Sequence, residues 1–256
     1  MTSPTAKDLS ISNMTPEEWQ SRVDCAAGYR LMEMFELTDL AEGMVGLRVS
    51  GEPDAYLIQE YGMFFDEITA SNLVKVRFDE EPDAGPGRPL NYSSCAQVKC
   101  ILQARPDLGC VIHTHTKATS IVASLKAGLM PLNQFSLIVL GHIVYVDYDP
   151  RNNDETMREI VEVLGEKKIV MIRNHGVLVT GITVAEAIFL TRTLEVACQS
   201  QIDAMKTGGD LYLPEGEITE EIIVDFALNP ANEFDGTRQW DAFLRRLDRV
   251  NPGYDS

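Results

Sequence analysis

The sequence predicts an α/β domain in which helices and strands alternate in layers around a central sheet. Short apolar runs bounded by turn residues are typical of strands, and longer stretches with apolar residues at helical spacing are typical of helices. Both patterns recur along the 256 residues without an internal repeat or a low-complexity segment. We therefore expect one domain over residues 15–256, preceded by a flexible polar arm over residues 1–14.

The first half of the domain is predicted to begin with a helix at Thr15. The run Thr-Pro-Glu-Glu offers a capping hydroxyl, a proline at the first helical position and a glutamate three residues after the cap. An apolar stripe continues this helix to about Leu37. Turn chemistry then separates three predicted strands, and a polar loop at Asp79–Pro89 leads to the next helix. These elements are Gly46–Val49, Ala55–Gln59, Leu73–Phe78 and the helix from Ser93 to about Ala104.

The second half continues the same alternation. Thr183 and Glu186 form a second capping box, which opens a long helix that reaches about Lys206. Two short amphipathic helices at 218–228 and 235–249 are expected to complete the domain beyond about residue 209. The remaining predicted helices are Lys117–Ala127, Asn133–Leu140 and Glu155–Leu164, and the remaining strands are Cys110–His113, His142–Asp147, Ile169–Arg173 and Val177–Thr180.

The charge balance argues against two classes of partner. Thirty-nine acidic and 22 basic side chains give a formal net charge of −17, which repels phosphate backbones and anionic membrane surfaces. The chain has neither an apolar run of about 18 residues nor a basic N-terminal segment followed by an apolar core. We expect a cytoplasmic protein that binds neither nucleic acid nor membrane. The five cysteines are odd in number and show no CxxC spacing, so reduced thiols are expected.

Three of the four histidines lie at the ends of predicted apolar strands. A strand directs side chains two residues apart to the same face, so His113 and His115 can both bind one ion. His175 follows another apolar strand in a similar place, whereas His142 is expected to have a surface or core role. Three neutral imidazoles can hold a borderline divalent metal and leave positions open for substrate. Because HxH pairs also occur as ordinary hydrogen-bonded histidines, the spacing alone leaves both interpretations open.

Three segments resemble the class II aldolase/adducin family. They read FFDEITASNLVKV at 64–76, ARPDLGCVIHTHTKATSIVAS at 104–124 and RNHGVLVTGITVAEA at 173–187, and they occur in family order. The resemblance runs from about Val23 to Gly208. It implies a central, mainly antiparallel β-sheet flanked by helices, and a homotetramer with active sites near subunit contacts. It also implies one divalent ion (zinc, manganese or iron) bound by His113, His115 and His175 as a Lewis acid that stabilises enolate-like charge.

The sequence departs from the family's aldolases at the proton-transfer positions. Their Ser-Ser-Glu run carries a glutamate that shuttles the proton, and the matching run here is Ser93-Ser94-Cys95. Cys95 is a candidate catalytic base if a metal lowers the thiol pKa, and otherwise a small buried hydrophobe. The family's aldolases usually carry a proton-donating tyrosine near the position of Gln134, and this sequence has glutamine there. An asparagine with which these aldolases bind the substrate phosphate is missing as well. Gly62, Ser93 and Ser94 remain candidate contacts for an anionic substrate group such as a carboxylate.

Three functions follow from these features. The first is a metal-dependent lyase that cleaves a small oxo- or hydroxy-acid by decarboxylation or retro-aldol reaction, because a chelated acid needs little help from a glutamate. The second is a non-haem iron(II) oxygenase, because three histidines leave positions for both substrate and dioxygen. The third is a non-catalytic, adducin-like interaction module, since the sequence around RPDLGC and GLMPL is similar to adducins. The retained histidines argue against the third function, and we favour the lyase.

Overall fold

The fold is built on a seven-stranded sheet with the order β3-β2-β1-β4-β7-β6-β5. The computed structural model describes residues 14–151, 153–214, 216–229, 231 and 234–256, so the predicted arm lies outside the described residues apart from Met14. Neighbouring strands are antiparallel except β5 and β6, which are parallel. The strands are β1 (Met44–Val49), β2 (Glu52–Ile58), β3 (Val74–Arg77), β4 (Cys110–Thr114), β5 (Ile143–Asp147), β6 (Ile169–Arg173) and β7 (Val177–Gly181).

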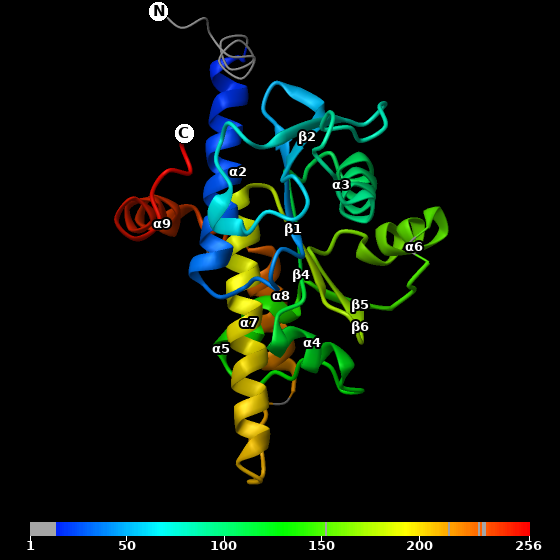
Figure 1. Cartoon of the computed structure of the whole chain (residues 1–256). Coiled ribbons are helices and arrows are strands. Elements are labelled where there is room, and N and C mark those ends of the chain that lie inside the picture. The colour runs from blue at the N-terminus through cyan, green and yellow to red at the C-terminus, as the bar shows by residue number, and fades with distance from the viewer. Residues whose placement is uncertain (1–13, 152, 215, 230, 232–233) are drawn as a thin grey trace, which may run out of the picture.

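Helices cover both faces of this sheet, which confirms the predicted layered α/β fold with a mainly antiparallel sheet (Figure 1). One face carries α2 (Pro16–Met34) and α7 (Val184–Lys206), and the other carries α3 (Tyr92–Ala104) and α6 (Asp154–Leu164). Around these lie α4 (Lys117–Ser124), α5 (Gln134–Leu140), α8 (Glu217–Leu228), α9 (Thr237–Val250) and the short 3-10 helix η1 (Phe65–Glu67).

Both predicted capping signals are present in the structure. The hydroxyl of Thr15 accepts a hydrogen bond from the backbone N–H of Glu18 at 3.1 Å, and Thr183 accepts from Glu186 at 3.2 Å. The first helix ends at Met34, three residues before the predicted end. The backbone of Glu36 has a φ of 57°, in the left-handed region that an α-helix cannot contain. Helix starts were thus predicted more accurately than this helix end.

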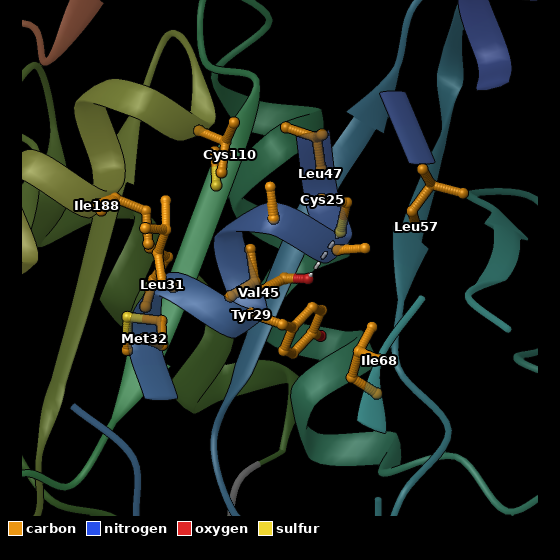
Figure 2. Packing of buried hydrophobic residues seen from close by; sticks show 14 of the residues in the cluster. Cys25, Tyr29, Leu31, Met32, Val45, Leu47, Leu57, Ile68, Cys110 and Ile188 are labelled. Carbon is orange, nitrogen blue, oxygen red and sulfur yellow. Dashed lines mark hydrogen bonds between the residues drawn. The ribbon is translucent and has the colours of Figure 1, made fainter. Parts of the chain in front are cut away.

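The alternation of side chains across the strands places the histidines on one face. Val45 and Ile112 pack with α2 and α7, and Figure 2 shows Val45 among side chains of that core. Met44 and Val111 pack with α3 and α6 on the opposite face. Because successive side chains of a strand point to opposite faces, His113, two residues after Val111, faces α3 and α6. The candidate site therefore lies between the sheet and these two helices.

Three further features bear on the expectations from the sequence. The five cysteines are free thiols, and all but Cys100 are buried. In the part of the chain that the structure describes, no helix is both long enough and apolar enough to cross a membrane. His142 is buried at the start of β5 and lies outside the cluster that the other three histidines form.

Candidate metal centre

The three strand-end histidines come together in space. His113 is the fourth residue of β4, His115 lies one residue beyond that strand, and His175 lies in the turn between β6 and β7. The Nε2 atom of His115 is 2.9 Å from Nε2 of His113 and 3.2 Å from Nε2 of His175. The third Nε2 pair, His113 and His175, is 3.3 Å apart. One nitrogen from each ring thus faces a common point.

A tight turn brings His175 beside the end of β4. Asn174 adopts a φ of 58°, which is the left-handed conformation that asparagine tolerates better than most residues. A Cβ added at Gly176 would lie 2.5 Å from the carbonyl oxygen of Thr114 and 2.7 Å from the ring of His115. The glycine therefore permits the close approach of the two strand ends, and asparagine suits the left-handed turn that precedes His175.

Burial keeps the imidazoles of His113 and His175 neutral, and the Nε2 atoms of all three rings face inward. Nδ1 of His113 is 3.0 Å from the carbonyl oxygen of Val177, which can only accept, so Nδ1 carries the proton. Nδ1 of His115 is 3.5 Å from a carboxylate oxygen of Asp39. Burial, helped by the two neighbouring imidazoles, lowers the pKa of His113 to about 3, and burial and His115 lower that of His175 to about 4.

The donor set fits a divalent metal ion. Nitrogen ligands about 2.0–2.1 Å from a tetrahedral ion are about 3.3 Å apart, and adjacent ligands of an octahedral ion are about 3.0 Å apart. The observed Nε2 separations of 2.9, 3.2 and 3.3 Å match these values. Lone pairs that converge at such distances repel one another unless a proton or a cation lies between them. Three imidazole nitrogens with free coordination positions suit a borderline ion of the zinc, manganese or iron type.

A cavity of ≈ 190 Å³ opens over the histidines. Its wall comes from the start of α3, the end of β5 and the loop into α6. Ser93 and Ser94, both predicted as substrate contacts, line it, and the side chain of Asn91 caps α3 by accepting from the N–H of Ser94 at 3.2 Å. Pockets for drug-sized ligands occupy roughly 300–1,000 Å³, so this cavity suits a smaller molecule.

Two predicted site residues do not reach this cavity. Gly62 lies in the turn after β2 and is not among the lining residues. Cys95 follows Ser94 in α3, and a helix rotates about 100° per residue, so the thiol faces the core while Ser94 faces the cavity. Its side chain is 1% exposed, and burial raises the pKa of the thiol. The structure therefore brings Ser93 and Ser94 to the histidines, and places Gly62 and Cys95 elsewhere.

An acidic side chain that sequence reasoning missed lies in the cavity wall. Glu42 precedes β1, and Met44 in that strand pairs with His113 in the sheet. The hydroxyl of Tyr61 donates a hydrogen bond to the carboxylate of Glu42 at 2.7 Å, which raises the pKa of Tyr61. No spacing signal could have indicated Glu42, because it reaches the histidines only through the pairing of β1 with β4.

Two other residues of the wall were also missed. The ring of Tyr148, in the loop after β5, stacks on the His175 ring with centroids 4.3 Å apart and planes 6° apart. Gln97 lies three residues after Ser94 on the same side of α3 and lines the cavity as well. Helical spacing from Ser94 could have revealed Gln97. Tyr148 could not have been found in this way, since its partner is 27 residues further along the chain.

The fold and the three-histidine cavity define an α/β protein of the class II aldolase type. Residues 23–202 match the family described as the class II aldolase and adducin N-terminal domain. The chain belongs to this family, which confirms the resemblance seen in the three sequence segments. The class II aldolases of the family are metal-dependent lyases, whereas the adducin relatives suggest a non-catalytic possibility for this chain.

Similar proteins come from both branches. A class 2 aldolase-like protein of Caulobacter vibrioides is 38% identical over 253 residues, which are 96% of each chain. Human gamma-adducin is 36% identical over 202 residues, which cover 77% of this chain and 28% of the adducin. An aldolase II superfamily protein from Pseudomonas syringae superposes with a TM-score of 0.87 at 35% identity, over 96% of this chain and 99% of that one. L-fuculose 1-phosphate aldolase from Glaciozyma antarctica shares the fold, with a TM-score of 0.78 at 19% identity and coverage of 98% and 96%.

Proposed function

We propose that the protein is a metal-dependent lyase that cleaves a carbon–carbon bond in a small oxo- or hydroxy-acid, by decarboxylation or retro-aldol reaction. The observation that carries this proposal is the convergence of three imidazoles at a small cavity. In this assignment, His113, His115 and His175 hold one divalent ion, which is zinc, manganese or iron. When bound, the ion supplies Lewis-acid stabilisation of the negative charge that develops on the substrate oxygen.

The start of α3 is assigned to the substrate carboxylate. Ser93 and Ser94 line the cavity in the first turn of this helix. Serine hydroxyl groups can donate hydrogen bonds to a carboxylate, and the helix dipole gives this first turn a partial positive charge. A carboxylate placed there gains hydrogen bonds despite the negative charge of the whole protein. Gly62 stays outside this assignment because it does not line the cavity.

Glu42 is assigned to proton transfer. Its carboxylate lies in the wall of the histidine cavity, where the hydroxyl of Tyr61 holds it by a hydrogen bond of 2.7 Å. A positioned carboxylate can accept a proton from a substrate hydroxyl or return one to a carbanion. Cys95 suits this role less well, because its thiol lies in the core and its pKa is raised. Glu42 would thus take over the proton transfer that a glutamate performs in the family's aldolases, a glutamate that the matching run of this sequence lacks.

We further propose that the chain is a single-domain cytoplasmic protein that assembles as a homotetramer. This proposal assigns to the chain the tetrameric assembly that its resemblance to the family implies. Sedimentation or light scattering is expected to give four times the 28.5 kDa mass of the chain. A monomer at micromolar concentration would contradict this assembly.

The decisive experiment begins with elemental analysis of protein purified without chelator. We expect about one zinc or manganese per chain. We also expect release of carbon dioxide or an aldehyde, in the absence of oxygen, from a panel of small oxo- and hydroxy-acids in which the cleaved carbon–carbon bond lies β to a carbonyl group, because the electron pair of that bond then passes to the carbonyl oxygen. Glu42→Gln should lower turnover strongly and leave the metal content unchanged. Bound iron together with product formation only in air would instead identify an oxygenase.

A second candidate function is a non-catalytic interaction module. The 36% identity to human gamma-adducin over 202 residues favours it. This function predicts no stoichiometric metal and no turnover of any acid in the panel. Protein that lacks metal after chelator-free purification, and that gains none on dialysis against zinc or manganese, would support this module over the lyase.

A further inference from the structure

The helix that follows His115 is held at its start by a carboxylate from another helix. Thr116 is the N-cap residue of α4, and its side chain makes no capping hydrogen bond within that helix. Glu195 of α7 takes this place. Its Oε2 atom accepts one hydrogen bond from the hydroxyl of Thr116 and another from the backbone N–H of Thr119 at 3.3 Å. First-turn N–H groups have no partner within their own helix, so Glu195 fixes the start of α4 against α7.

Nothing else in the surroundings accounts for this carboxylate. In the part of the chain that the structure describes, no basic side chain forms an ion pair with Glu195, and the hydrogen bonds of its side chain are those to α4. Thr116 and Thr119 are 4% and 0% exposed, so the contact is shielded from water on the α4 side. Loss of Glu195 would therefore leave two buried donors of α4 without their partner.

α4 contacts both of the turns that carry His115 and His175. His115 directly precedes the N-cap residue of α4, so the position of the first turn sets the position of the His115 backbone. One turn further on, the hydroxyl of Ser120 donates a hydrogen bond to the backbone carbonyl of His175 at 2.9 Å. His113 lies within β4, which β1 and β7 hold on either side. The placement of the other two imidazoles relative to His113 thus depends in part on α4.

We propose that Glu195 is a positioning residue of the metal centre; this inference rests on the metal site of the proposed function. By fixing the first turn of α4, Glu195 holds His115, and through Ser120 also His175, at the spacing that one ion requires. The Nε2 separations of 2.9 and 3.2 Å leave little room for displacement, because nitrogen ligands of one ion are about 3.0–3.3 Å apart. Glu195 itself lies outside the histidine cavity and touches neither ion nor substrate.

Zinc titration of the full chain against a competing chelator tests this role. Glu195→Ala removes both hydrogen bonds to α4 and should weaken zinc binding by about 10–100-fold, the usual cost of losing a group that orients metal ligands. Glu195→Gln removes the charge but keeps an oxygen that can accept both hydrogen bonds. It should therefore bind zinc at least about fivefold more tightly than Glu195→Ala. Glu159→Ala removes the same charge from an exposed position of α6 and should bind zinc like the wild type.

Cobalt(II) provides a second measurement that a change in stability alone does not alter. The visible absorption of bound cobalt reports its coordination geometry, so Glu195→Ala at saturating cobalt should show shifted or weakened bands, and Glu195→Gln should keep the wild-type spectrum. Thr116→Val removes one of the two donors and should weaken zinc binding as well. In the double variant with Glu195→Ala, the loss should be smaller than the sum of the two single losses, because the two side chains act as one contact.

The possible outcomes separate this inference from the proposed function. Wild-type zinc affinity and an unchanged cobalt spectrum in Glu195→Ala would overturn the inference, and a lowered melting temperature beside them would show a purely structural role. Equal losses in Glu195→Gln and Glu195→Ala would assign the effect to charge and also overturn it. If Glu195→Ala does not fold, Thr116→Val and Glu195→Gln provide the same comparison. A wild type that binds neither zinc nor cobalt would overturn the metal centre and the lyase together, whereas one that binds metal but cleaves no acid would overturn the lyase alone.

Discussion

Replacement of His115 by alanine should abolish metal-induced stabilisation. The Nε2 atom of His115 lies 2.9 and 3.2 Å from the other two Nε2 atoms, so the substitution leaves two of three donors. Loss of an outer-shell residue costs about 10–100-fold in metal affinity, and loss of a ligand should cost at least about 100-fold. The side chain of His115 is 22% exposed, so its removal leaves no closed cavity and the metal-free fold should persist.

The expected shifts follow from binding linkage. Metal at 100 times its dissociation constant stabilises the folded wild type by about 2.7 kcal/mol, which corresponds to a rise of roughly 5–10 °C in melting temperature for a chain of this size. At the same metal concentration, a variant with 100-fold weaker binding gains about 0.4 kcal/mol, or roughly 1–2 °C. Differential scanning fluorimetry with and without zinc measures both values.

His142→Ala is the control for this experiment. His142 is buried but lies outside the histidine cluster, so its variant should show the wild-type shift above its own metal-free melting temperature. A full metal-induced shift in His115→Ala would refute the ligand assignment, whatever the effect on activity.

Three further predictions concern the core and its charges. Gly46→Ala should lower the free energy of unfolding by about 1–3 kcal/mol in urea titrations, because its Cβ would lie 2.3 Å from a methyl carbon of Val98, whereas Gly209→Ala should change it little. Cys95→Ser should keep more than about a tenth of the lyase activity, because the thiol packs in the core; a loss of roughly a thousandfold would make Cys95 catalytic. Burial lowers the pKa of His142 from 6.5 to about 4, so the unfolded chain binds a proton that the folded chain does not. The stability of the metal-free protein should therefore be full above pH 6.5 and fall as the pH drops toward 4. His113 and His175 contribute in the same direction, so His142→Ala should reduce this fall in the urea midpoints without abolishing it.

Much of the architecture could be predicted from sequence because it depends on neighbouring residues. The caps at Thr15 and Thr183 use side chains three residues apart, and strand and helix periods are visible in contiguous segments. The meeting of His113 and His115 is of the same kind, since both side chains leave one strand end on one face. Hydrophobic periodicity does not say which strands pair, so the sequence did not predict the strand order, and the family resemblance implied only a mainly antiparallel sheet.

The composition of the cavity was decided by tertiary structure. Glu42 enters through the pairing of β1 with β4, and Tyr148 enters because β5 lies beside β6 and its loop reaches His175. Ser94 and Cys95 are neighbours in α3, and the rotation of about 100° between successive residues of a helix directs Ser94 to the cavity and Cys95 to the core. Comparison of sequence motifs does not reveal this difference. The sequence determined the local elements and the histidine pattern, because both follow from short-range spacing. Strand pairing and helix rotation decided which other side chains surround the histidines, because these depend on packing between segments far apart in the chain.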